Sequence, residues 1–246
     1  MLLAGLCAVV LALFGLPLLL VLLVVGSSWP VGGNDGGSRD IPREALAAYA
    51  GASASAGSVV PGCTLPVWVL MAIGKVESNH AAGHSITARG EVAPPVVGPA
   101  LDGSLPGTAR VPDTDRGSLD GDPVWDHALG PMQILPSTWR AWGQDANGDG
   151  VVDPQDYADA ALTAAVILCQ PPADLSNRDE LSTALHRYNN SDAYVASVLS
   201  WAAFYAGPQR GPDGKPLALA ERTGPSEAPT ASRLRSPSER DRRGSL

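Results

Sequence analysis

The order of hydrophobic and polar positions divides the chain into four parts. Residues 1–26 are almost entirely apolar and carry no charge, whereas residues 27–42 are mostly Gly, Ser and Asp. Over residues 43–206 apolar side chains recur every three or four positions, which is typical of amphipathic helices. Residues 207–246 are rich in Pro, Arg, Ser and Gly. The pattern predicts an apolar first helix, a linker, a mainly α domain and a disordered tail.

The first apolar segment is long enough to cross a bilayer as a helix, despite Pro17. We interpret residues 1–26 as a single-pass membrane anchor that leaves the domain outside the cytoplasm. The alternative is a signal peptide cleaved near VVGSS at residues 24–28, in which case the protein is secreted. Because no Lys or Arg precedes the segment, the positive-inside rule does not fix its orientation.

Inside the predicted domain, five segments have helical periodicity that follows a capping residue or a proline. They are 65–79 after Thr64, a segment from Pro136, one from Pro154 with Asp153 as its cap, one after Asn177 and one after Ser191. The segment Glu91–Asp126 differs from these, since it is long, rich in Gly, Pro and Asp, and without a period. Loops of that length inside a compact domain are usually functional.

Cysteine usage and charge narrow the possible classes of protein. Outside the apolar segment the cysteines are Cys63 and Cys169, which in an exported chain predict one disulfide. The alternative is two buried free thiols. The formal net charge of −8 argues against a nucleic acid as the partner.

The sequence DANGDGVVDPQD at residues 145–156 has the spacing of an EF-hand calcium loop. Its predicted ligands are Asp145, Asn147, Asp149, the backbone carbonyl of Val151, and Asp156. The last position holds Asp instead of the usual Glu, so this carboxylate reaches less far. Since the chain has one such loop, we expect a structural calcium ion; the alternative is a polar turn without an ion.

One carboxylate lies on the apolar face of the helix predicted over 65–79. Val67, Leu70, Ile73 and Glu77 follow one another at spacings of three and four. Burial disfavours the charged form of a carboxyl group and raises its pKa. Such a group can protonate a leaving oxygen near neutral pH, as the glutamic acid of lysozyme does. Alternatively, Glu77 is a structural residue paired with an arginine.

Four segments, in this order, resemble lytic transglycosylases of the lysozyme-like superfamily. They are GKVESNH at 74–80, GPMQILPSTW at 130–139, the calcium-type loop at 145–156 and HRYNNSDAYV at 186–195. The pattern is most similar to the membrane-bound lytic transglycosylase B type, in the form found in high-GC Gram-positive bacteria. The resemblance implies a lysozyme-like (SLT) α domain that cleaves peptidoglycan glycan strands.

The resemblance also assigns roles to individual residues. It makes Glu77 the catalytic acid and base, and it places Ser78, Gln133, Tyr188 and Asn189 against the glycan. The implied reaction cleaves the bond between N-acetylmuramic acid and N-acetylglucosamine and closes a 1,6-anhydro ring, without water or a second carboxylate.

Some details depart from the family pattern or stay open. His80 stands where the family often has an aromatic residue, so we expect sugar stacking to differ there, and Gly74 leaves room for a sugar or for another helix. The Asp-rich segment 113–122 is either an exposed loop or the source of a second acid for a muramidase-type hydrolase. A non-catalytic wall-binding protein is the remaining alternative. We expect a monomer.

Overall fold

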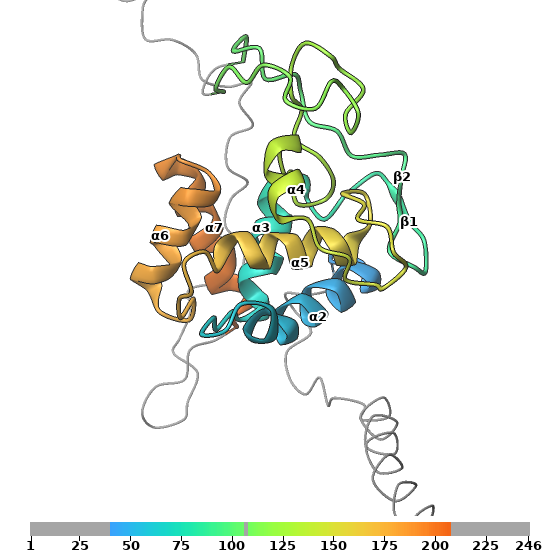
Figure 1. Ribbon diagram of the computed structural model, residues 1–246. Coiled ribbons are helices and arrows are strands. Elements are labelled where there is room, and N and C mark those ends of the chain that lie inside the picture. The colour runs from blue at the N-terminus through green and yellow to red at the C-terminus, as the bar shows by residue number, and fades with distance from the viewer. Residues whose placement is uncertain (1–39, 106–107, 208–246) are drawn as a thin grey trace, which may run out of the picture. The chain divides into compact units, whose positions relative to one another are not determined.

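The computed structural model describes residues 40–105 and 108–207 (Figure 1). The chain divides into two units, residues 1–35 and 36–246, and all described residues belong to the second. The predicted anchor at 1–26, most of the predicted linker at 27–42 and almost all of the predicted tail at 207–246 lie outside the described residues. Within the described ranges, no helix has the length and apolar character needed to cross a membrane.

The described residues are mainly helical, as the sequence predicted. The elements are α2 (Arg43–Val59), α3 (Val67–Ser78), β1 (Ser85–Ile86), β2 (Val92–Ala93), α4 (Pro136–Trp142), α5 (Tyr157–Leu168), α6 (Arg178–Tyr188) and α7 (Asp192–Tyr205). The two short strands pair antiparallel, with Ser85 opposite Ala93. Residues 94–135, which include most of the predicted irregular segment, form no helix in their described part.

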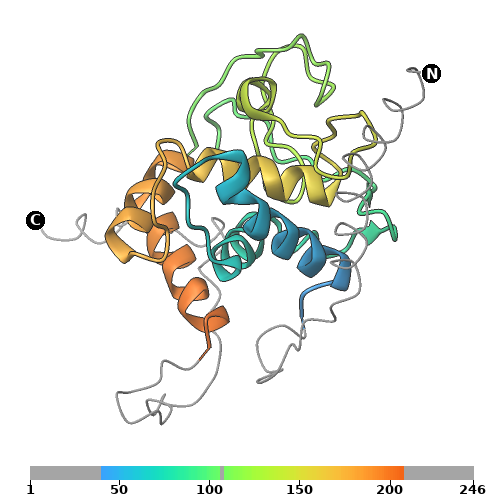
Figure 2. The same ribbon diagram turned by 60° about the horizontal axis from the view of Figure 1, so that its bottom comes forward.

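The centre of the domain is α5, which packs along α2, while α3 packs along α7 (Figures 1 and 2). The buried positions of α2 and α5 are mostly alanine, so the two helix backbones can approach closely. The sequence did not single out α2 as a helix, because a stripe of alanines interrupted by glycine and serine gives little hydrophobic contrast.

A buried hydrogen-bonded chain ties four helices together around Gly74. The Tyr49 hydroxyl lies 3.1 Å from Nδ1 of His80 and 2.9 Å from the Tyr157 hydroxyl. Nε2 of His80 lies 3.0 Å from the Tyr205 hydroxyl. A Cβ atom on Gly74 would overlap the Tyr49 hydroxyl, so this glycine makes room for α2 and not for a sugar.

The His80 ring is not available to stack on a sugar. The residue is 1% exposed, with its ring enclosed by the tyrosines. Burial and the charge of Lys75 lower the pKa of His80 to about 4, which keeps the ring neutral at physiological pH. His80 therefore has a structural role.

Of the predicted helix caps, two are confirmed and two are wrong. The Asn177 side chain accepts from the backbone of α6, and the Ser191 side chain from that of α7. Thr64 does not cap α3, which begins at Val67 after Pro66. Asp153 does not cap α5 either: its carboxylate accepts from Gln155 N in a turn that delays the helix by three residues.

A disulfide joins Cys63, which precedes α3, to Cys169 at the end of α5. The two Cα atoms lie 5.7 Å apart, within the usual range for a disulfide. The structure therefore pairs the two cysteines as the sequence predicted, and the bond closes a loop that contains most of the domain.

Candidate active site

Glu77 lies in the last turn of α3, beyond the buried residues Leu70, Ile73 and Gly74. Its side chain keeps a limited contact with solvent, but the surrounding protein removes most of its hydration. Burial raises the pKa of Glu77 to about 7, against the opposing effect of a hydrogen bond from Tyr194. Near neutral pH the group is therefore protonated in a large fraction of molecules.

Tyr194, in the first turn of α7, donates its hydroxyl hydrogen to Oε1 of Glu77 at 2.7 Å. Its ring is stacked against Tyr188, with an interplanar angle of 4° and the ring centroids 6.5 Å apart. Sequence reasoning did not connect Tyr194 with Glu77. The two residues are 117 positions apart, and no local pattern signals their contact.

Ser78 and Tyr188 attach two distant segments to the turn that precedes α4. The Ser78 hydroxyl donates to the Pro131 carbonyl at 2.7 Å and accepts from Ala81 N at 2.9 Å. The Tyr188 hydroxyl donates to the Met132 carbonyl at 2.7 Å. The structure thus brings together the predicted segments 74–80, 130–139 and 186–195 around Glu77.

The other two predicted glycan-binding residues are less closely tied to Glu77. Gln133 has a positive φ of 49°, and its amide donates to the Gly130 carbonyl at 3.0 Å and to the Ala128 carbonyl at 3.3 Å. It therefore braces its own turn and is half-buried. Asn189 is exposed at the C-terminal end of α6.

No second carboxylate among the described residues accounts for the raised pKa of Glu77. Its causes are burial, which raises the pKa, and the Tyr194 hydrogen bond, which lowers it. In the segment 113–122, which could have supplied a second acid, Asp113 and Asp122 both accept hydrogen bonds from backbone N–H groups of their own loop. The raised pKa of Glu77 therefore needs no contribution from a second carboxylate.

The predicted calcium ligands lie in a largely exposed loop, and the atoms predicted to bind the ion are all oxygens. Asp145 accepts from the backbone N–H groups of Gly148 and Gly150, and Asp149 accepts from Val151 N. The Asn147 amide N–H group donates to a carboxylate oxygen of Asp149 and to one of Asp156, both at 3.2 Å, so these side chains meet through an N–H donor and not through ligand oxygens. The oxygen atoms that these residues carry are of the type that a hard cation such as Ca²⁺ prefers.

Asp156 also has a second task that its predicted ligand role did not include. It is 3% exposed, and Oδ1 caps α5 by accepting from Ala158 N at 2.8 Å and Asp159 N at 3.2 Å. Its other oxygen, Oδ2, faces Asn147. One oxygen of the Asp156 carboxylate therefore caps α5, and the other points into the loop.

A separate pocket of about 360 Å³ lies between α2 and α5. Its lining includes Arg43, Glu44, Arg89 and Tyr157 but none of the predicted catalytic or glycan-binding residues. This pocket does not include Glu77, whose pKa and contacts mark it as a group that can donate a proton.

Comparison with known proteins gives limited information. No protein-family model matches the sequence, and no curated protein matches it. Among solved structures, the chain is similar to that described as the X-ray structure of catenated lytic transglycosylase SltB1 from Pseudomonas aeruginosa. The TM-score is 0.40 at 13% sequence identity, over 75% of this chain and 85% of that chain.

Proposed function

We propose that the protein is a peptidoglycan lytic transglycosylase with Glu77 as its single acid and base. The observation that carries the proposal is a partly exposed carboxyl group with a pKa of about 7, held by Tyr194. A group with this pKa is protonated often enough to act as an acid, and it ionises readily enough to act as a base in the next step. The sequence resemblance supplies the substrate class.

In the proposed reaction, protonated Glu77 donates its proton to the glycosidic oxygen between N-acetylmuramic acid and N-acetylglucosamine. The C1–O bond breaks and leaves an oxocarbenium-like centre on the muramic acid. The C6 hydroxyl of the same sugar then attacks C1 and gives its proton to the Glu77 carboxylate. A 1,6-anhydro ring closes, Glu77 regains its proton, and no water is consumed.

The neighbouring residues position this group and the glycan. Tyr194 fixes one oxygen of Glu77 and stabilises its carboxylate form in the second half of the reaction. Ser78, through the Pro131 carbonyl, and Tyr188, through the Met132 carbonyl, fix the turn that carries Gln133. In the proposal Ser78, Tyr188, Gln133 and Asn189 contact the sugars on the exposed side.

The proposal also includes the surroundings of the enzyme. Residues 1–26 anchor a monomeric domain to the outer face of the cell membrane, or direct its secretion if they are removed. A calcium ion held by Asp145, Asn147, Asp149, the carbonyl of Val151 and Asp156 would clamp the loop before α5. Its role would be structural, since α5 forms the centre of the core.

The decisive test is digestion of purified sacculi by the full chain and by Glu77→Gln, with products identified by mass. Anhydromuramic ends that depend on Glu77 are expected. Reducing ends would replace the proposal by a muramidase-type hydrolase. Glycan binding without cleavage by either protein would indicate a wall-binding protein.

A further inference from the structure

The irregular segment before α4 is a hairpin-like loop. Backbone bridges pair Val97 with Leu129 and Pro112 with Trp125, and Asp126 N donates to the Val111 carbonyl at 3.1 Å. In Figure 1 this green segment projects beyond α4. The two ends of the loop meet beside the turn that carries Gln133, a residue of the proposed active site. There, Gly98 N donates to the Ala128 carbonyl, and the same carbonyl accepts from the Gln133 amide.

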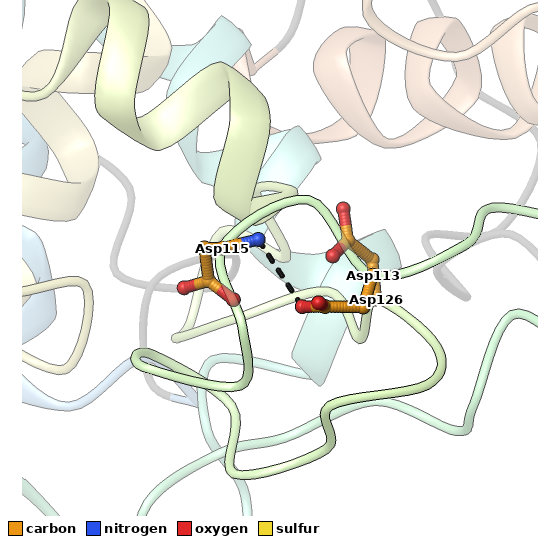
Figure 3. A group of neighbouring side chains, drawn as sticks. All are labelled: Asp113, Asp115 and Asp126. Atoms are coloured by element: carbon orange, nitrogen blue, oxygen red, sulfur yellow. Dashed lines mark hydrogen bonds between the residues drawn. The ribbon is translucent and has the colours of Figure 1, made fainter.

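Three aspartates from the two arms of this loop converge. Asp113, Asp115 and Asp126 each place one carboxylate oxygen so that the three oxygens lie within 4.8 Å of one another (Figure 3). Asp126 is completely buried, and Asp113 and Asp115 are partly buried. In the described ranges of the chain this is the one group of three acidic, histidine or cysteine side chains that converges in this way.

One oxygen in this group is buried without a partner. Oδ1 of Asp115 has less than 1 Å² of accessible surface and takes part in no hydrogen bond, and it is the one such side-chain atom among the described residues. The other oxygen, Oδ2, accepts from Leu119 N and the Ser118 hydroxyl, both at 2.9 Å. A buried carboxylate oxygen without a partner is costly, and a cation at this oxygen would remove that cost.

The described part of the chain places no positive side chain against this oxygen. Among the described residues, no Lys, Arg or His nitrogen lies within 4.0 Å of a carboxylate oxygen of these three aspartates. Arg140, which reaches the loop, donates instead to the Thr114 carbonyl at 2.8 Å. The polar partners of the cluster are neutral: Asp126 accepts from Thr114 N at 2.8 Å and from the Thr114 hydroxyl at 2.7 Å.

Backbone N–H groups of its own loop hold the Asp113 carboxylate in place. Oδ1 accepts from Asp115 N at 3.1 Å and from Gly117 N at 3.0 Å, and Oδ2 accepts from Arg116 N at 3.0 Å. Backbone donors thus fix its carboxylate without neutralising it. A negative site that is already held in place loses little entropy when a cation binds.

We propose that Asp113, Asp115 and Asp126 form a binding site for a divalent cation of the calcium class. Calcium prefers carboxylate oxygens and accepts irregular arrangements in which water completes the coordination. The ion would occupy the partnerless side of Asp115 and link residues 113–115 to residue 126 across the loop. It would thereby brace the arm that continues through Ala128 to Gln133.

The test is titration calorimetry of the full chain with CaCl₂ after removal of metals by a chelator, using Asp115→Asn. This variant keeps the size of the side chain and removes its charge. We expect it to bind one calcium ion fewer per chain than the original protein. Asp122→Asn is the matched control, because Asp122 lies in the same loop but outside the cluster, and it should bind the full number.

The loop at 145–156 must be separated from this site. In an Asp145→Asn background the chain should still bind one calcium ion, and adding Asp115→Asn should remove it. Unchanged stoichiometry on Asp115→Asn, or no calcium bound by the Asp145→Asn chain at millimolar concentration, overturns the proposal.

Thermal melting distinguishes a loss of calcium binding from a folding defect in the variant. In chelator, Asp115→Asn should melt no lower than the original protein, because an unpartnered buried charge has been removed. In calcium, the Asp145→Asn chain should gain melting temperature and its Asp115→Asn derivative should not. Equal gains in both chains would show that no ion binds at these aspartates.

Discussion

The last turn of α3 and the loop at 113–126 shift the pKa of a carboxyl group in opposite directions. Glu77 loses its hydration and receives one hydrogen bond, from Tyr194, so its pKa rises to about 7. Asp113 is surrounded by backbone donors, so its pKa falls below the usual value. The direction of the pKa shift thus follows from the balance between lost hydration, which dominates at Glu77, and backbone N–H donors, which dominate at Asp113. The first arrangement suits proton transfer and the second suits holding a charge.

The largest effect is expected from removing the carboxyl group of Glu77, the member of the pair that is suited to proton transfer. Glu77→Gln should lower glycan cleavage by about a thousandfold or more, because the amide has no proton to give. Release of anhydromuropeptides from sacculi, followed by mass spectrometry, measures this. As a control, Glu91→Gln changes an exposed glutamate in β-bridge contact with Asp156 and should keep full activity. Activity retained in Glu77→Gln would remove Glu77 from the mechanism.

Removing the hydrogen-bond donor to Glu77 should widen the difference between the pKa values of Glu77 and Asp113. Tyr194→Phe eliminates the hydrogen bond that lowers the pKa of Glu77, so the pKa should rise further. We expect a loss of roughly tenfold in kcat/KM at neutral pH, with the alkaline limb of the pH profile moved to higher pH. Tyr188→Phe is the matched control, since its hydroxyl bonds the Met132 carbonyl.

A structural role of Tyr194 alone gives a different result. In that case Tyr194→Phe would lose activity equally at every pH, and the alkaline limb would stay where it is in the original protein. Tyr188→Phe should leave the limb in place in either case, which separates positioning of Glu77 from general damage.

The raised pKa of Glu77 should make the free energy of unfolding of the domain decrease as pH rises. Its pKa is about 7 in the folded protein and 4.5 in the unfolded chain, so folded molecules bind more protons between these values. Stability therefore falls as pH rises through this window. At pH 8 Glu77→Gln should raise the free energy of unfolding by roughly 1–3 kcal/mol, allowing for partial exposure, and at pH 4 the difference should vanish. Urea unfolding at both values measures this.

The smallest expected effect is that of Asp113→Asn, which should lower stability where Glu77→Gln raises it. Because the folded pKa of Asp113 is lowered, its carboxylate stabilises the fold above the unfolded pKa, and that contribution is lost as pH falls through the folded value. In chelator at pH 7 the variant should melt slightly lower than the original protein, and near pH 2 the two should melt alike. A higher melting temperature at pH 7 would contradict the inferred role of the backbone donors.

Much of the fold could be predicted because its signals are local. The spacing of Leu70 and Ile73 predicted α3, and Asn177 and Ser191 marked the starts of α6 and α7. The prediction failed for α2, where alanines give little contrast, and for the start of α5, where the turn at residues 153–156 had no local signature. These errors arise because helix–helix packing decides between segments of similar propensity.

The sequence by itself determined that the chain is mainly helical and that Glu77 lies on an apolar helix face. It also paired Cys63 with Cys169, since no other cysteines were available outside the apolar segment. Periodicity and composition suffice for such features, because they depend on neighbours along the chain.

Only the tertiary structure decided which groups surround the carboxylates. It brought Tyr194 to Glu77 across 117 positions and buried His80 between two tyrosines. It also brought Asp126 to Asp113 and Asp115, while leaving one Asp115 oxygen without a partner. Protonation and ion binding depend on donors and charges within a few ångströms, and these come from segments that are distant in the chain.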